Sequence, residues 1–159
     1  MDTGHGVSIV EVQPVLVAGL RRKGRYTLIP VMILELFGFL GEKGICPAGG
    51  PVYLWHEGTP EAAFAADAAG TADVEVVVPV AGRFPPSGEI SCYHLPGGRM
   101  VRAIHRGPYQ ECTSTYERLF AWIADHGLSV TGPMREIYHN DPREVKPEEI
   151  LTEILAPVG

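Results

Sequence analysis

The residues best suited to chemistry are one carboxylate and several aromatic rings on two short predicted strands. Side chains of a strand point alternately to its two faces, so Glu136 and Tyr138 share one face of the strand that begins at Met134. A matching strand in the first half of the chain presents Tyr53 and Trp55 toward the same side. Ring faces attract positive charge, each by about 0.5 to 2 kcal/mol, and a partly desolvated carboxylate neutralises it. The pattern predicts a site for an organic cation, and leaves open that Glu136 has a raised pKa and acts as an acid or base.

The opposite side of these two strands carries aliphatic residues. Val52, Leu54 and Ile137 lie there, and we expect that side to face the helices. Tyr93 and Tyr109 are weaker candidates for the wall of the site, and Tyr109, just before a helix, could instead pack against the start of that helix. The predicted ligand contacts are therefore led by the carboxylate and its three aromatic neighbours.

Two other glutamates and one histidine have plainer explanations. Glu75 and Glu153 match across the two halves of the chain, but Glu is also frequent in edge strands, where it discourages aggregation. His105 has no evident partner in the sequence. A Glu in a strand is more often exposed to solvent than bound to a ligand. Only Glu136, with its aromatic neighbours, is therefore singled out as a ligand-binding residue.

An internal repeat positions these residues. The segment that starts at Gly24 aligns without a gap on the segment that starts at Gly107. Within each segment, residues recur at the spacing of one face of an amphipathic helix, the first expected over Thr27 to Lys43. Each helix ends at a glycine suited to a left-handed conformation, Gly44 or Gly127. The apolar stripe consists of Ile33, Leu36, Phe37 and Leu40 in the first helix and Tyr116, Leu119, Phe120 and Ile123 in the second.

Each predicted helix follows a strand-like run and precedes two short strands. The sequence thus predicts one domain, 1–159, made of a first repeat at about 7–82 and a second at about 88–158. We expect an α+β fold of duplicated β-α-β-β units with pseudo-twofold symmetry and a mainly antiparallel sheet. Two long helices would cover one face, and a ligand cavity would lie on the other. The Ala-rich segment 59–72 has no counterpart and is expected to form a loop, a short helix or a mobile flap.

Composition narrows the classes of function. The chain has 159 residues, 45% hydrophobic and 20% charged, as in a globular protein. With 13 basic and 19 acidic residues the net charge is −6, which disfavours nucleic acid as a partner. Three widely spaced cysteines predict neither a disulfide framework nor a zinc site. The longest apolar run is too short for a membrane span, and the N-terminus lacks the pattern of a signal peptide, so we expect a cytoplasmic protein.

The sequence resembles a known family over nearly its whole length. VRAIHRGPYQECTSTYERLFAWIADHGL, REIYHNDP and EEILTEILAPV resemble the second half of GyrI-like domains, and VYLWHEG and VEVVVPV are similar to the first half. These are also called effector-binding domains, as found at the C-terminus of multidrug-sensing regulators of the MerR and AraC types. The resemblance implies a duplicated fold with a cavity between the halves and, at the position of Glu136, a glutamate that contacts lipophilic cations.

The resemblance leaves three roles open. The first is a stand-alone protein that binds a hydrophobic, cationic or aromatic small molecule, without a cofactor, for sensing or sequestration of xenobiotics. The second is a hydrolase of strained, cyclopropanoid natural products, in which Glu136 acts with Tyr109 or Tyr138. The third is an inhibitor of a protein partner, of the gyrase-inhibitor type.

Two features bear on partners. The residues before the first helix are strand-like, so no helix-turn-helix is predicted and direct DNA binding is not expected. Additional apolar residues on the first helix, Val31, Met32 and Phe39, reflect either a wider core or a homodimer face.

Overall fold

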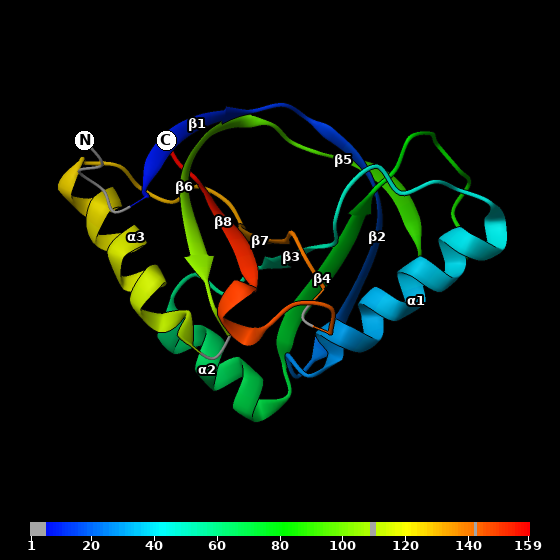
Figure 1. Cartoon of the computed structure of the whole chain (residues 1–159), viewed down its shortest axis with the longest axis horizontal. Coiled ribbons are helices and arrows are strands. Elements are labelled where there is room, and N and C mark those ends of the chain that lie inside the picture. The colour runs from blue at the N-terminus through cyan, green and yellow to red at the C-terminus, as the bar shows by residue number, and fades with distance from the viewer. Residues whose placement is uncertain (1–5, 109–110, 142) are drawn as a thin grey trace. The chain divides into compact units, whose positions relative to one another are not determined.

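The chain forms two compact units of the same topology. The computed structural model describes residues 6–108, 111–141 and 143–159. One unit, called the first unit below, comprises Pro14–Pro96, and the second unit comprises Met1–Gln13 with Gly97–Gly159 (Figure 1). Helices and antiparallel strands alternate in both, which confirms the predicted α+β class.

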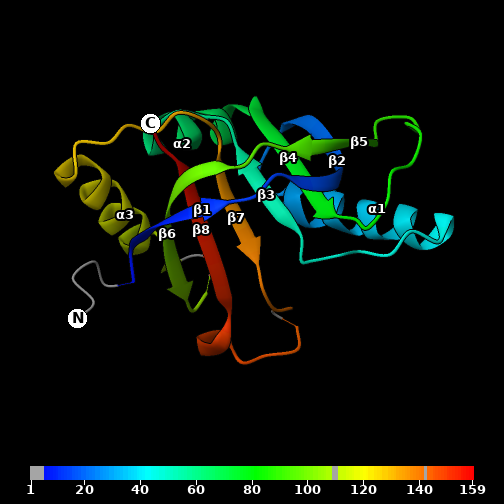
Figure 2. The ribbon, with the colours of Figure 1, turned by 90° about the horizontal axis from the view of Figure 1, so that it is seen from above.

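The first unit consists of four strands and two helices. Its strands are β2 (Val15–Gly24), β3 (Val52–Trp55), β4 (Ala72–Pro79) and β5 (Ser91–Leu95), and its helices are α1 (Leu28–Lys43) and α2 (Pro60–Ala69). The strand order is β3-β4-β2-β5, and every pair is antiparallel. Helix α1 packs along β2 and β4, as two views of the ribbon show (Figures 1 and 2).

Helix α1 forms nearly where the sequence predicts it. Its buried face consists of Met32, Leu36 and Leu40, and burial of each such side chain contributes about 1.5 to 3 kcal/mol. Gly44 ends the helix with φ of 69°, and its N–H donates to the carbonyl of Gly41. Met32 therefore belongs to the core, whereas Val31 is 49% exposed.

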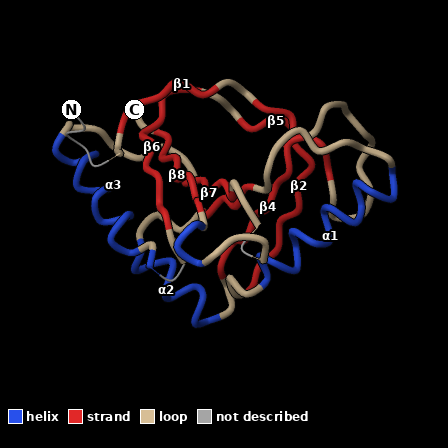
Figure 3. The backbone as a smooth tube through the Cα atoms, viewed as in Figure 1, coloured by secondary structure: helices blue, strands red, loops and turns tan. Residues whose placement is uncertain are grey.

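The second unit repeats this arrangement without α2. Its strands are β1 (Ser8–Val12), β6 (Gly98–Arg106), β7 (Met134–Tyr138) and β8 (Leu151–Pro157), with helix α3 (Thr113–Asp125) and a short 3-10 turn, Pro147–Glu149, before β8. The order β7-β8-β6-β1 matches that of β3-β4-β2-β5, and α3 packs beside β6 as α1 packs beside β2 (Figure 3).

The strand-like run before each long helix is two strands, not one. In the first run, β1 pairs with β6 in the second unit, whereas β2 belongs to the first unit. In the second run, β5 pairs with β2, and β6 belongs to the second unit. Pro14 and Pro96 stand at the breaks, because proline lacks the N–H that a continuous ladder needs.

The Ala-rich segment is a helix. Thr59 caps it, because its side chain accepts a hydrogen bond from the N–H of Ala62, and Gly70 ends it with φ of 71°. Helix α2 contains no buried residue, and its Phe64 is 71% exposed. Polar links hold it, including the carboxylate of Asp67, which accepts from the N–H of Tyr26 at 2.8 Å.

Candidate functional site

Glu136 of β7 is the centre of a cluster of hydroxyl donors in the second unit. The phenol of Tyr138, two residues along the strand, donates to Oε1 at 2.9 Å. The phenol of Tyr116, from α3, donates to Oε2. All three side chains are half-buried. The predicted pairing of Glu136 with Tyr138 is therefore present, and the helix supplies a third member.

The environment of Glu136 favours its neutral form. Burial removes water from the carboxylate and raises its pKa above the ordinary value of 4.5, although the hydrogen bonds from Tyr116 and Tyr138 act in the opposite direction. Within the described residues, no arginine, lysine or histidine forms an ion pair with Glu136. This carboxyl group lies in a place that a positive charge would stabilise.

The prediction that the aliphatic faces of β3 and β7 meet the helices is wrong. Paired residues of an antiparallel ladder point to the same side, and Glu136 pairs with Ile154 on the side that α3 covers. In the first unit, Trp55 pairs with Val74 on the side of α1.

Tyr53 and Trp55 accordingly lie in the core of the first unit. Tyr53 is 4% exposed and Trp55 6% exposed, and the ring of Tyr53 meets that of Tyr26 edge-on at 5.8 Å. The aliphatic residues Val52 and Leu54 point to the opposite side, away from α1. Alternation along a strand shows which residues share a face, but it does not show which face a helix covers, because both faces here are apolar.

The predicted tyrosines Tyr93 and Tyr109 are not among the described contacts of Glu136, whereas Tyr116 is. Tyr109 lies outside the described residues, and Tyr93 belongs to the first unit, where it contacts Glu75. Tyr116 was predicted to belong to the apolar stripe of its helix. The signal that could have singled it out is its hydroxyl, which a stripe of otherwise aliphatic and phenylalanine side chains would not satisfy.

His105 is a satisfied core histidine. It is 5% exposed, its Nδ1 lies 2.9 Å from the hydroxyl of Thr115, and its Nε2 lies 2.8 Å from the carbonyl of Pro108. The sequence shows no partner for it because Thr115 comes from α3, and the contact forms only when that helix packs on β6.

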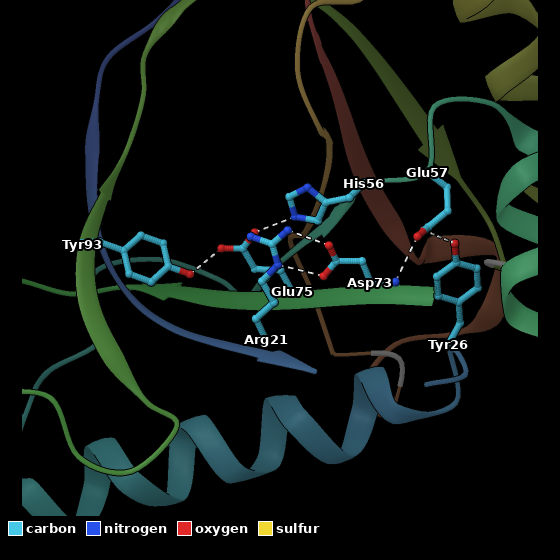
Figure 4. Close-up of polar contacts among 7 residues, drawn as sticks. All are labelled: Arg21, Tyr26, His56, Glu57, Asp73, Glu75 and Tyr93. Carbon is cyan, nitrogen blue, oxygen red and sulfur yellow. Dashed lines mark hydrogen bonds and ion pairs between the residues drawn. The ribbon is translucent and has the colours of Figure 1, made fainter. Parts of the chain in front are cut away.

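A second polar cluster surrounds Glu75 of β4 in the first unit (Figure 4). Its Oε1 lies 2.7 Å from Nε2 of His56, and its Oε2 accepts from the phenol of Tyr93 at 2.5 Å. Burial acts to raise the pKa of Glu75, but these two hydrogen bonds outweigh it and the net pKa is lowered. The edge-strand explanation of Glu75 and Glu153 is wrong, because β4 and β8 each pair with strands on both sides.

The loops after β3 and β7 make the same two contacts in their own units. His56 binds Glu75, and the next residue, Glu57, accepts the backbone N–H of Asp73 at 2.9 Å. In the second unit, His139 lies 2.7 Å from Glu153, and Asn140 accepts the N–H of Leu151 at 3.1 Å. We call this pair of contacts the clasp; it ties each short strand to the last strand of its unit.

Neither a metal-binding group nor a membrane-spanning helix is found among the described residues. They contain no group of three or more His, Cys, Asp or Glu side chains placed to hold a metal ion. Among the same residues, no helix has the length and hydropathy needed to cross a membrane.

Comparison with known proteins identifies the family. A family model described as "GyrI-like small molecule binding domain" matches residues 5–158. The chain belongs to this GyrI-like family. No curated protein is similar enough to count as a match.

Solved structures share the GyrI-like fold. The C-terminal domain of EcmrR superposes with a TM-score of 0.83 at 23% sequence identity, over 96% of each chain. In the EcmrR–DNA complex the matched region is 56% of the EcmrR chain, at 22% identity and a TM-score of 0.83, and it covers 96% of this chain.

Two further GyrI-like neighbours differ in what they are described as doing. A hydrolase encoded by lin2189 from Listeria innocua has a TM-score of 0.69 at 15% identity, over 98% of this chain and 92% of its own. SAV2435, solved bound to tetraphenylphosphonium, has a TM-score of 0.56 at 12% identity, over 96% of this chain and 93% of its own. At these identities the likeness concerns the fold.

Proposed function

We propose that this GyrI-like protein binds a hydrophobic organic cation, with the carboxylate of Glu136 as its counter-charge. The observation that carries the proposal is the contrast among the buried carboxylates. Glu75 and Glu153 each have a histidine within 2.7 Å, and Glu153 also has an arginine, whereas the hydrogen-bond partners of Glu136 among the described residues are two phenols. A positively charged ligand would form an ion pair with the Glu136 carboxylate and so stabilise its ionised form.

The surroundings of Glu136 fit a ligand that is both apolar and charged. The rings of Tyr116 and Tyr138 flank the carboxylate, and Phe120 stacks on Tyr116 at 6.3 Å on the same helix. Aromatic faces attract a cation, and their area also stabilises an apolar ligand by burial. Hydrogen-bond donors on the ligand are not required, because both carboxylate oxygens already accept one.

The test is calorimetric titration of the whole chain with tetraphenylphosphonium and with an uncharged analogue, triphenylphosphine oxide. Glu136→Gln keeps the shape of the side chain and removes its charge. We expect the variant to lose at least about tenfold in affinity for the cation, equivalent to about 1.4 kcal/mol, and to leave the binding of the neutral analogue unchanged.

The matched control is Glu153→Gln. It removes one negative charge from β8 of the same unit, on the side of the sheet opposite to Glu136. We expect it to bind the cation as the wild type does, so that a general effect of net charge is excluded. Equal losses in both variants, or no loss in Glu136→Gln, would contradict the proposal.

A hydrolase that uses Glu136 is the second candidate, favoured by the two phenols that it contacts. A carboxyl group with a raised pKa is better suited to donate a proton than to activate water. In that reaction Glu136 would protonate the carbon that leaves as the ring C–C bond breaks, water would bond to the other carbon, and the proton that this water loses would return to Glu136; Tyr138 or Tyr116 would hold the carboxyl in place. Recovery of the ligand unchanged after incubation distinguishes binding from hydrolysis.

A further inference from the structure

His56 is held in the geometry of a general base. Its Nε2 lies 2.7 Å from Oε1 of Glu75, whose lowered pKa keeps that carboxylate ionised at neutral pH. An ionised carboxylate only accepts hydrogen bonds, so Nε2 donates to Glu75 and Nδ1 is the ring nitrogen that does not face the carboxylate. Among the described residues Nδ1 has no hydrogen-bond partner. The His56 side chain is 20% exposed, so Nδ1 is available to a water molecule or a substrate.

Glu75 is itself fixed from the other side. The phenol of Tyr93 donates to Oε2 at 2.5 Å, and the Glu75 side chain is only 9% exposed. Tyr93 reaches the carboxylate because position 19 is glycine: a Cβ on Gly19 would lie 1.9 Å from the Tyr93 hydroxyl oxygen. The sequence thus leaves a space on β2 that lets β5 supply the second partner of Glu75. A base oriented by a carboxylate that is itself held in place is the arrangement expected of a catalytic histidine.

Arg21 adds a positive charge beside this pair. Its Nε and Nη2 donate to the two oxygens of Asp73 at 2.7 and 2.6 Å, which fixes the plane of the guanidinium. Nη1 takes no part in these bonds, and the side chain is 54% exposed. Figure 4 shows the Arg21 guanidinium next to His56 and Glu75, on the side of β4 away from α1. A fixed donor beside a base is suited to hold the negative oxygen that forms on an attacked carbonyl.

We propose that His56, Glu75 and Arg21 form a hydrolytic site for small carboxylic esters, separate from the Glu136 cluster. His56 Nδ1 takes a proton from water as the water oxygen bonds to the ester carbonyl carbon, and the carbonyl oxygen becomes an oxyanion beside Arg21. The C–O bond to the alcohol then breaks, and the imidazolium returns the proton to the leaving alkoxide. The products are a carboxylic acid and an alcohol, and His56 is regenerated. Glu75 and Tyr93 are positioning residues in this scheme.

The second unit provides an internal control. His139 makes the same 2.7 Å contact with Glu153, but there Arg102 also donates to the carboxylate, at 2.9 Å from Oε2. Arg102 thus binds the carboxylate that orients His139, whereas Arg21 makes its hydrogen bonds to Asp73 and Glu75 accepts from Tyr93 instead. The His139 side chain is also 42% exposed, against 20% for His56, so it is less firmly held and we expect the second pair to contribute only to structure.

The experiment measures hydrolysis of p-nitrophenyl acetate by the whole chain in four forms: wild type, His56→Gln, Arg21→Gln and His139→Gln. We expect His56→Gln to lower kcat/KM by on the order of 100-fold, the usual scale for a general base. Arg21→Gln should lower kcat with little change in KM, because the oxyanion forms only in the transition state. His139→Gln should keep the wild-type rate. The wild-type rate should fall in deuterium oxide, because a proton moves in the rate-limiting step.

Several outcomes would overturn the proposal. One is a wild-type rate no higher than that of the same concentration of imidazole. Another is an equal loss in His56→Gln and His139→Gln, which would mark both as surface histidines. Circular dichroism shows whether His56→Gln folds. If it does not, Arg21→Gln tests the proposal instead, because the Arg21 side chain is exposed and its loss should leave the fold intact. An unchanged kcat in Arg21→Gln would contradict the proposed site. His56→Gln and Arg21→Gln leave Glu136 in place, so their affinity for tetraphenylphosphonium is measured separately, and failure of the hydrolytic site is distinguishable from failure of the cation-binding proposal.

Discussion

Binding of a cation at Glu136 should release a proton. Because burial raises the pKa of Glu136, part of the ligand-free protein is neutral at this position at pH values where an ordinary carboxyl, with a pKa of 4.5, is ionised. A positive ligand favours the ionised form and therefore lowers that pKa. Affinity for the cation is thus full above the pKa of Glu136 in the free protein, and it decreases as the pH falls through that value.

The size of the effect follows from one titrating group. Below the pKa of Glu136, affinity should fall by up to tenfold for each pH unit, or about 1.4 kcal/mol. For an unperturbed carboxyl this slope would begin only below about pH 4.5. In this protein it should begin at a higher pH, and at most one proton should be released per ligand bound.

Calorimetric titrations with tetraphenylphosphonium at several pH values measure the slope directly. Repeating them in two buffers of different ionisation enthalpy counts the protons released. Glu136→Gln should bind weakly with no slope, whereas Glu153→Gln should retain the slope of the wild type. A wild-type affinity that is constant down to pH 4.5, or an equal slope in Glu136→Gln, would refute the reasoning.

Three further predictions concern the clusters and the clasps. Tyr116→Phe removes a donor that favours the ionised form of Glu136, so the pH profile of cation binding should shift to higher pH, measured by the same titrations. Gly19→Ala should push the phenol of Tyr93 away from Glu75 and lower the unfolding free energy in urea by about 1 to 3 kcal/mol; an unchanged midpoint would contradict the close contact. His56→Ala should cost more stability than His139→Ala, because Glu75 is more buried than Glu153, and Arg21 beside it is already paired with Asp73, whereas Arg102 binds Glu153 directly.

Local pattern was enough to predict the two long helices, α1 and α3, but it left the state of segment 59–72, which is α2, open. The stripe that includes Leu36 and Leu40 and the glycine at 44 define α1, since helix periodicity and a left-handed cap are properties of a short stretch of chain. The repeat predicted that the strands after each helix correspond, and β3 and β7 do occupy the same place in their units. The repeat also aligns Glu75 with Glu153, and the two residues make equivalent contacts with His56 and His139.

Nonlocal contacts explain what the sequence did not reveal. That Glu136 faces α3 depends on which side of the sheet the helix packs, which alternation alone leaves undetermined. The partners of Glu75 come from a loop, His56, and from another strand, Tyr93, so only the fold brings them together. Both runs before the helices are strand-like along their length, and only strand pairing shows that β1 belongs to the second unit.

Carbon-13 NMR of glutamate side-chain carboxyls tests the central claim most directly. The signal of Glu136 is assigned by its loss in Glu136→Gln, and the protein is then titrated with tetraphenylphosphonium at a fixed pH where Glu136 is partly protonated. The account predicts that this signal moves to the position of an ionised carboxylate as the site saturates, while the signal of Glu153 stays in place. Saturation of binding with the Glu136 signal unmoved would contradict the account.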